Sequence, residues 1–191
     1  MGNFFTDVIS RDKRFDAVER ISDASLLEPA TRQLIAGIIT AAGDMGIELM
    51  LYETYRSQKR QQALFNQGAT RLRNVGVHHY GLACDIVKVV GGDPSWKGDF
   101  CFLGQLAQSS GLIWGGDWGA PHIKHTFVDA VHVQRCTVSR QSALFAGAWF
   151  PGPDYNPYDD EQHLLLAAAA PDPPLNVKAT SPLSPSDSGA T

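Results

Sequence analysis

The segment GVHHYGLACDIV, residues 76–87, governs how the rest of this chain is interpreted. It places two adjacent histidines, His78 and His79, seven and six residues before Asp85, and an apolar run follows the aspartate. An isolated buried carboxylate is costly, so Asp85 needs a partner if it opens a core strand. Gly81 allows a turn that brings an imidazole back beside that carboxylate. Two interpretations stay open here: a turn before a core strand, or two ligands of one metal ion.

The composition narrows the class of protein. The 191 residues, of which 43% are hydrophobic and 19% charged, suit one globular domain with some excess chain. A formal net charge of −4 argues against a nucleic-acid binder that acts through bulk electrostatics. No apolar run is long enough for a membrane span, so we expect no membrane insertion. Cys84, Cys101 and Cys136 have no CxxC spacing, which predicts buried thiols rather than disulfides.

Hydrophobic periodicity predicts a fold of interleaved helices and strands. Helices are expected at residues 26–42, 57–68 and 99–109, and strands at 46–55, 82–90 and 130–134. Because no βαβ rhythm repeats, we predict an α+β domain with a small antiparallel sheet flanked by helices. The composition changes to Pro, Ser and Ala after residue 148, which predicts a domain at 1–148 and a mostly disordered tail at 149–191.

A second polar cluster, DAVHVQ at residues 129–134, strengthens the metal interpretation. Asp129 stands three residues before His132, and again an apolar run follows. A carboxylate at this offset from a ligand histidine is suited to act as a general base and then as a proton donor. Neither His122 nor His125 has an acid three residues before it.

These motifs resemble those of a known family. The pattern H-x-x-G-x-A-x-D is met by His78, Gly81, Ala83 and Asp85. Followed by acid-x-x-His, it is similar to the VanY-type zinc peptidases, which include D-alanyl-D-alanine carboxypeptidases and L-alanyl-D-glutamate endopeptidases of bacteria and phages. The segments ETYRSQKRQQALFNQG (53–68) and GLIWGGDW (111–118) resemble two further family blocks, the latter most of all in the endolysin-like branch. The resemblance spans residues 29–134.

The resemblance implies a fold of the hedgehog and D-Ala-D-Ala peptidase type that binds one Zn²⁺ ion. The zinc ligands that it implies are His78, Asp85 and His132. It further implies that Asp129 activates the attacking water, and that Arg56 stabilises the negative charge developing on the scissile carbonyl oxygen.

Other residues in the same blocks are candidates for substrate contacts. The resemblance places Ser57, Gln61 and Trp118 near the substrate. For Ser57 and Gln61 the alternatives are a helix cap and a solvated helix face, and either residue could also orient Arg56. Asp117 fits equally well as a hydrogen-bond partner of a ligand histidine or as a turn acid.

The sequence departs from the family pattern at several positions. Gly76 stands where the family often has serine, which puts a hydrogen bond near the first ligand in doubt. The connection GAPHIKHTFV (119–128) is longer than usual, and its His122 is a rival third ligand. A ligand role for His79 in place of His78 would break the spacing to Asp85, so we expect His79 on the substrate side or at the surface.

The resemblance implies a zinc metallopeptidase that hydrolyses the stem peptide of peptidoglycan. The GGDW block favours an L-alanyl-D-glutamate endopeptidase over a D,D-carboxypeptidase. A module that binds metal without catalysis is the alternative from another class, and the presence of Asp129 and Arg56 argues against it.

The N-terminus MGNFFTDVISRDKRF does not read as a signal peptide. We therefore expect a monomer made in the bacterial cytoplasm, which reaches the wall through holin pores as an endolysin or through a secretion apparatus as an antibacterial toxin.

Overall fold

The computed structural model of the chain describes residues 2–70, 72–121 and 123–160. Its α-helices are α1 (Phe4–Asp7), α2 (Pro29–Asp44), α3 (Gln58–Asn66), α4 (Cys101–Ser109) and α5 (Gln141–Phe145). Its strands are β1 (Leu49–Glu53), β2 (Ala83–Val90), β3 (Asp93–Ser95), β4 (Ile113–Trp114) and β5 (His132–Gln134). Single 3-10 turns are η1 (Ile9–Arg11), η2 (Ala24–Leu26), η3 (Val77–Tyr80) and η4 (Val138–Arg140).

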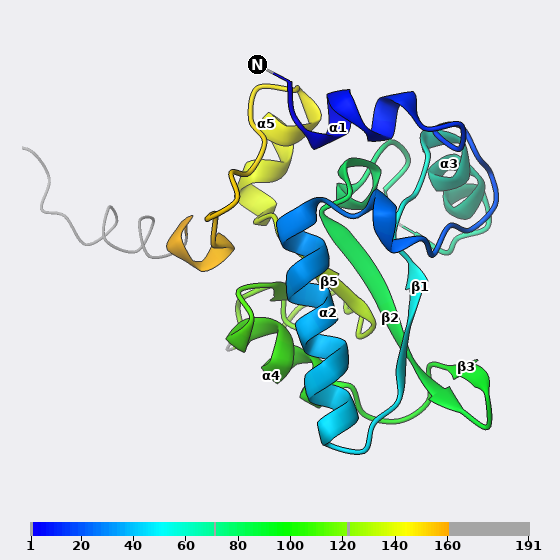
Figure 1. The fold of residues 1–191 in the computed structure, drawn as a ribbon, viewed down its shortest axis with the longest axis vertical. Helices are drawn as coiled ribbons and strands as arrows, with labels where there is room; N and C mark the ends of the chain where they lie inside the picture. The colour runs from blue at the N-terminus through cyan, green and yellow to red at the C-terminus, as the bar shows by residue number, and fades with distance from the viewer. Residues whose placement is uncertain (1, 71, 122, 161–191) are drawn as a thin grey trace, which may run out of the picture.

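The strands form one antiparallel sheet in the order β1-β2-β5-β4, and β3 pairs with the far end of β2. Helices α2 and α4 lie against this sheet, with β2 running through its centre (Figure 1). The predicted α+β fold with a small antiparallel sheet is therefore confirmed. Asp85 of β2 pairs with Glu53 on one side and with His132 on the other. This register brings side chains from three distant parts of the sequence together.

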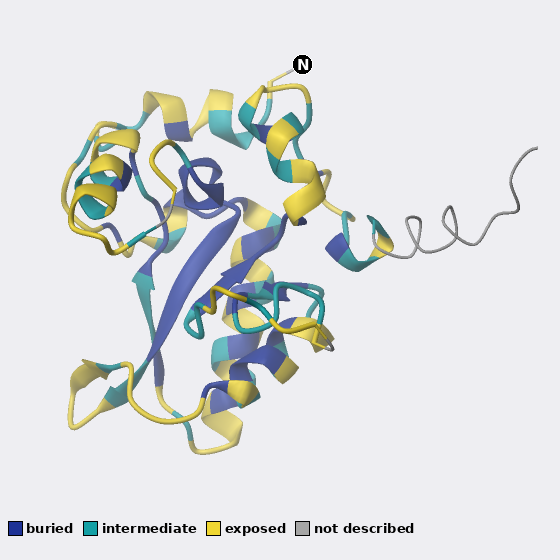
Figure 2. Cartoon of the chain, turned by 180° about the vertical axis from the view of Figure 1, so that it is seen from behind, coloured by how far each residue is buried: buried dark blue, intermediate teal, exposed yellow. Residues whose placement is uncertain are grey.

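The core lies on the face of the sheet that α2 and α4 cover. Successive side chains of a strand point to opposite faces, and Cys84, Ile86 and Val133 belong to the same buried cluster as residues of both helices. Burying an aliphatic side chain such as that of Ile86 or Val133 stabilises the fold by about 1.5–3 kcal/mol. Asp85 and His132 alternate with these residues and so face the opposite side. Seen from behind, β2 is buried along most of its length (Figure 2).

Helix α2 begins three residues later than its apolar pattern predicted. Residues 24–26 form the separate turn η2, and Pro29 then takes the first helical position. The carboxylate of Glu28 caps the helix by accepting a hydrogen bond from the Thr31 amide at 2.8 Å. The capping geometry, rather than the apolar periodicity, therefore sets the start of the helix.

A fully buried arginine fastens the segment after α5 to this helix start. Arg135 Nη1 lies 3.0 Å from Glu28 Oε2, and its Nη2 donates to the carbonyls of Gly152 and Pro153, each at 2.7 Å. Trp149 and Phe150 pack against a buried cluster of the domain. Packing thus continues past the expected boundary at residue 148, at least to residue 160, and the predicted tail from 161 onward lies outside the described residues.

The cysteines are free, as predicted, but one of them is not buried. Cys84 and Cys136 lie in the interior, whereas Cys101 is exposed at the start of α4. The prediction of a buried thiol is wrong for Cys101, because it is the exposed first residue of α4, whereas the buried residues of this helix are Leu103, Gly104 and Ala107. Within the described ranges, no helix has the length and apolar character needed to cross a membrane.

Candidate metal centre and catalytic cleft

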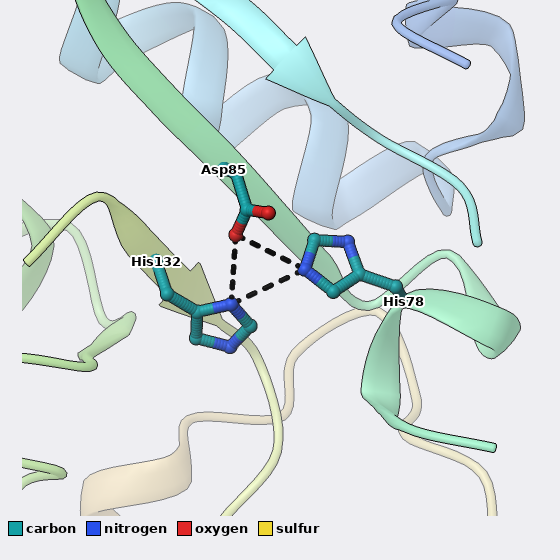
Figure 3. A group of neighbouring side chains, drawn as sticks. All are labelled: His78, Asp85 and His132. Atoms are coloured by element: carbon teal, nitrogen blue, oxygen red, sulfur yellow. Dashed lines mark hydrogen bonds and ion pairs between the residues drawn. The ribbon is translucent and has the colours of Figure 1, made fainter. Parts of the chain in front are cut away.

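Three buried side chains converge on the open face of the sheet. Asp85 Oδ1 lies 3.2 Å from His78 Nε2 and 3.1 Å from His132 Nδ1, and the two nitrogens are 3.2 Å apart. Figure 3 shows that the side chains come from η3, β2 and β5 and point toward one another. They are 3%, 7% and 7% exposed for His78, Asp85 and His132. The sequence-predicted ligands therefore meet at one point.

The size of this triangle fits a metal ion. Nitrogen and oxygen ligands about 2.0–2.1 Å from a tetrahedral ion lie about 3.3–3.4 Å from one another. The three observed separations, 3.1–3.2 Å, approach that value without a steric clash. In the part of the chain that the structure describes, this is the one group of His, Cys, Asp or Glu side chains so arranged. Two imidazoles and one carboxylate suit several divalent ions.

Burial and the neighbouring charges shift the pKa values of Asp85 and His132 in opposite directions. Burial would raise the pKa of Asp85, but the charges and hydrogen bonds of His78 and His132 hold it well below its usual range. Burial lowers the pKa of His78. Burial also disfavours the charged form of His132, but the hydrogen bond and charge of Asp85 outweigh it and raise the pKa. Asp85 is thus ionised and ready to bind a cation.

Gly81 explains why the first ligand precedes a glycine by three residues. Its φ of 71° lies in the left-handed region, where it ends η3 and turns the chain into β2. A Cβ at this position would lie 2.5 Å from the carbonyl oxygen of Leu26. Glycine is therefore needed both for the backbone angle and for the close approach, and the turn carries His78 back over Asp85.

The second histidine of the motif, His79, is packed in the interior of the protein. The ring of His79 is 7% exposed and packs against four aromatic side chains, those of Phe5, Phe15, Tyr55 and Tyr80. Burial lowers its pKa. The expectation of a substrate-side or surface position for His79 is wrong, because consecutive residues of η3 point in different directions and the N-terminal segment covers this one.

Asp129 is held beside the triangle by the glycine-rich segment after β4. The Gly115 amide donates to the His132 carbonyl, and the Gly115 carbonyl accepts from the Asp129 amide, each at 2.8 Å. A Cβ on Gly115 would lie 2.5 Å from the Asp129 carbonyl oxygen, so a side chain there would push the two segments apart. Burial raises the pKa of the Asp129 carboxyl, and the charge of Asp85 adds to this effect. A raised pKa suits a general base.

Arg56 reaches the same cleft between two carboxylates. Its Nη2 lies 3.0 Å from Asp85 Oδ2, and its Nε donates to Glu53 Oε2 at 2.8 Å. Arg60 also binds the Glu53 carboxylate. The guanidinium is therefore fixed at the edge of the triangle, although burial opposes its charge. Glu53 was not singled out from the sequence. The signal was its spacing of three and seven residues from the two arginines in ETYRSQKR.

The predicted substrate contacts differ in their surroundings. Ser57 does not line the cleft: its hydroxyl accepts from the Arg60 amide at 3.0 Å and donates to the Ala17 carbonyl. This favours the helix-cap alternative, and the expectation of substrate contact is not supported for Ser57. Gln61 lines the cleft but is buried, with Oε1 3.4 Å from Arg56 Nη1. Its burial excludes the solvated-face alternative, and its contact with Arg56 favours an orienting role over a substrate contact.

Trp118 forms one wall of the cleft. Its ring stacks on Phe127 with centroids 6.0 Å apart and lies 5.5 Å from the ring of His132. Its backbone φ of 52° is unusual for a bulky residue, so the surrounding turn constrains it. The neighbouring Asp117 accepts from the Gly119 amide at 2.9 Å, which is the turn-acid alternative.

The cleft has a volume of about 550 Å³ and is lined by the three ligand candidates, by Asp129 and Arg56, and by Glu53, Arg60 and Gln61. Ser57, His79 and Asp117 are not among the residues that line it. Aromatic side chains along its walls are those of Tyr52, Trp96, Trp118 and Phe127. Apolar walls around a few convergent polar groups are typical of a ligand site. The rival ligand His122 lies outside the described residues.

The two histidines differ in the hydrogen bonds of the ring nitrogens that face away from the candidate metal-binding triangle. His78 Nδ1 is buried and has no hydrogen-bond partner among the described residues, which agrees with the hydrogen bond expected to be missing at Gly76. His132 Nε2, in contrast, lies 3.0 Å from Gln134 Oε1. Gln134 was not singled out from the sequence. The available signal was its position two residues after His132 in a strand, which puts both on one face.

Two histidines, two aspartates and an arginine converge on one cleft, Asp85 and His132 from the sheet and the other three from the segments beside it. Such a group of side chains is typical of a metal-dependent hydrolase. The peptidoglycan L-alanyl-D-glutamate endopeptidase CwlK of Bacillus subtilis is 30% identical to this chain, over 54% of this chain and 73% of CwlK. The chain belongs to this family of VanY-like peptidases. The L-alanyl-D-glutamate peptidase of Listeria phage A118 is also 30% identical, over 60% of this chain, and the match covers 40% of the phage protein. No family model matches the sequence.

Solved structures with a similar trace include the Serratia marcescens L-Ala D-Glu endopeptidase ChiX, at 22% identity and a TM-score of 0.47, with 62% of this chain and 90% of ChiX covered. The D,D-pentapeptidase VanY of a VanB-type resistance cassette, solved with Zn(II), has 16% identity and a TM-score of 0.46, with 63% and 78% covered.

Proposed function

We propose that this protein is a zinc-dependent endopeptidase that cleaves the bond between L-alanine and D-glutamate in the stem peptide of peptidoglycan. The observation that carries the proposal is the buried triangle of His78, Asp85 and His132 beside Asp129. The choice of bond is supported by the relative CwlK of the same family, which is an L-alanyl-D-glutamate endopeptidase.

Each of these side chains has a separate role in amide hydrolysis. His78, Asp85 and His132 would hold the zinc ion, which when bound polarises the scissile carbonyl and activates water. Asp129 takes a proton from the attacking water and then passes a proton to the leaving amine. The Arg56 guanidinium stabilises the negative charge that develops on the carbonyl oxygen. Trp118 and Phe127 form an apolar wall that limits access of bulk water.

Mass spectrometry of peptidoglycan fragments after digestion by the purified protein tests the bond that is cleaved. Cleavage after L-alanine releases the rest of the stem peptide with a new N-terminal D-glutamate, and leaves L-alanine on the glycan. Release of a single terminal D-alanine would instead make the protein a D,D-carboxypeptidase. Disaccharide-peptide substrates with four-residue and five-residue stems separate these outcomes, because a D,D-carboxypeptidase needs the terminal D-Ala-D-Ala of the five-residue stem.

We propose that the protein acts as a monomer on the cell wall after it leaves the cytoplasm. The relative from Listeria phage A118 favours a holin-dependent endolysin over an antibacterial toxin delivered by a secretion apparatus. Co-expression with a holin should then lyse the host cell, whereas the protein without a holin should not. Toxicity that appears only when a fused signal peptide directs the protein to the periplasm, without lysis through a holin, would favour the toxin.

A further inference from the structure

Gln134 is buried directly behind one of the candidate metal ligands. It is the last residue of β5, it is 1% exposed, and alternation along the strand puts it on the same face as His132. Its Oε1 lies 3.0 Å from His132 Nε2, on the side of the ring that faces away from Asp85. Its Nε2 donates to the carbonyl oxygen of Cys136.

These two contacts fix the orientation of the amide. The Cys136 carbonyl is an acceptor only, so the nitrogen of the Gln134 amide must face it and the oxygen must face His132. An amide turned the other way would place two acceptor oxygens against each other in a buried site. Because Gln134 Oε1 accepts, His132 Nε2 must carry the proton.

The protonation of one ring nitrogen determines what the other can do. In the neutral ring, a proton on Nε2 leaves the lone pair on His132 Nδ1, and this is the atom that lies 3.1 Å from Asp85 Oδ1 and 3.2 Å from His78 Nε2. A neutral imidazole binds a metal through its unprotonated nitrogen. His78 has no comparable partner, since its Nδ1 makes no hydrogen bond to the described residues.

We propose that Gln134 is a positioning residue, which holds His132 in the tautomer and ring orientation that bind the metal ion through Nδ1. The proposal rests on the proposed function only in requiring that the site binds a divalent metal. It makes His132 the preorganised ligand of the site and leaves His78 to be oriented by the ion itself.

The affinity for zinc, measured on the full chain by competition with a chromophoric chelator and without substrate, tests this role. Gln134→Met keeps the length of the side chain but removes both hydrogen bonds, and we expect zinc to bind about 10- to 100-fold more weakly. Gln141→Met is the matched control, because Gln141 lines the same cleft without contacting a ligand; we expect wild-type affinity. Equal affinity of Gln134→Met and wild type would overturn the proposal.

A second measurement needs no variant and so does not depend on how Gln134→Met folds. Nitrogen-15 NMR of histidine-labelled, zinc-loaded protein should show His132 protonated on Nε2 and metal-bound through Nδ1. A proton on Nδ1 would contradict the proposal. Neither measurement uses peptidoglycan, so a failure of the proposed peptidase activity is seen separately, in the digestion assay.

Discussion

Arg56 Nη2 lies 3.0 Å from Oδ2 of Asp85, while the other oxygen of the same carboxylate faces His78 and His132 at 3.2 and 3.1 Å. One carboxylate therefore joins the candidate metal centre to the arginine that we assign to the developing negative charge. This arrangement fixes the guanidinium relative to the metal ligands before substrate enters.

Replacement of Arg56 by glutamine should reduce kcat while the protein keeps its zinc. We expect a loss of about 10²–10³-fold, the usual effect of removing one group that stabilises the charge on the carbonyl oxygen. Steady-state rates on a purified muropeptide, together with metal analysis, check this. Arg60→Gln is the control, since Arg60 shares the Glu53 carboxylate but does not contact Asp85, and it should stay within a few-fold of wild type. Full activity of Arg56→Gln would remove Arg56 from the mechanism.

Replacement of Asp129 by alanine should separate catalysis from metal binding. Loss of the base is expected to lower the rate by about 10²–10⁴-fold without loss of zinc, because Asp129 stands beside the triangle and not in it. His132→Ala should lose the zinc itself. Zinc content and digestion of purified peptidoglycan distinguish the two variants, and a wild-type rate for Asp129→Ala would show that the assigned base is wrong.

The Gly81→Ala variant should be less stable than the wild type. The left-handed φ of 71° costs a non-glycine residue about 1–2 kcal/mol, and the added Cβ would also meet the Leu26 carbonyl oxygen at 2.5 Å. In contrast, Gly37 lies exposed within α2 with nothing within 4 Å of an added Cβ. Gly37→Ala should stabilise the protein by about 0.5–1 kcal/mol. Urea unfolding measures both, and equal stability of the two variants would contradict the account of the turn.

Asp160 should make the stability of the protein depend on pH. Hydrogen bonds from Arg140 and Tyr155 lower the pKa of its carboxyl below the usual range of an aspartate. A lowered pKa in the folded state means that this stabilisation is complete above the unfolded pKa and is lost as the pH falls through the folded pKa. The free energy of unfolding of wild type should therefore exceed that of Asp160→Asn near neutral pH, and the difference should shrink toward pH 2. A difference between wild type and Asp160→Asn that stays the same from neutral to acidic pH would contradict this prediction.

The spacing of residues predicted much of this fold because the relevant forces are local. Alternation across β2 placed Cys84 in the core and Asp85 on the opposite face, and both positions follow from the period of a strand. The environment of His79 could not be predicted in this way, since the rings of Phe5 and Phe15 that cover it lie more than sixty residues away in sequence. Packing between distant segments leaves no periodic signal.

In the candidate site, too, local spacing predicted some residues, whereas contacts that depend on the folded structure were missed. The spacing of histidines and acids predicted the three ligand candidates and Asp129, because that spacing reflects chemistry shared with a family. The hydrogen bonds of Gln134 and the paired contacts of Glu53 were missed, since each depends on a rotamer and a strand register that the sequence does not encode locally. The Ser57 hydroxyl was ambiguous for the same reason, and its contacts with Arg60 and Ala17 favour the cap.

Titration of metal-free protein with zinc, followed by the rate of release of new amino groups from purified peptidoglycan, tests the central claim most directly. The rate should be negligible after removal of metal by a chelator, should rise in proportion to added zinc, and should level off at about one ion per chain, as expected for a single site with three protein ligands. Undiminished release by the metal-free protein would contradict the account.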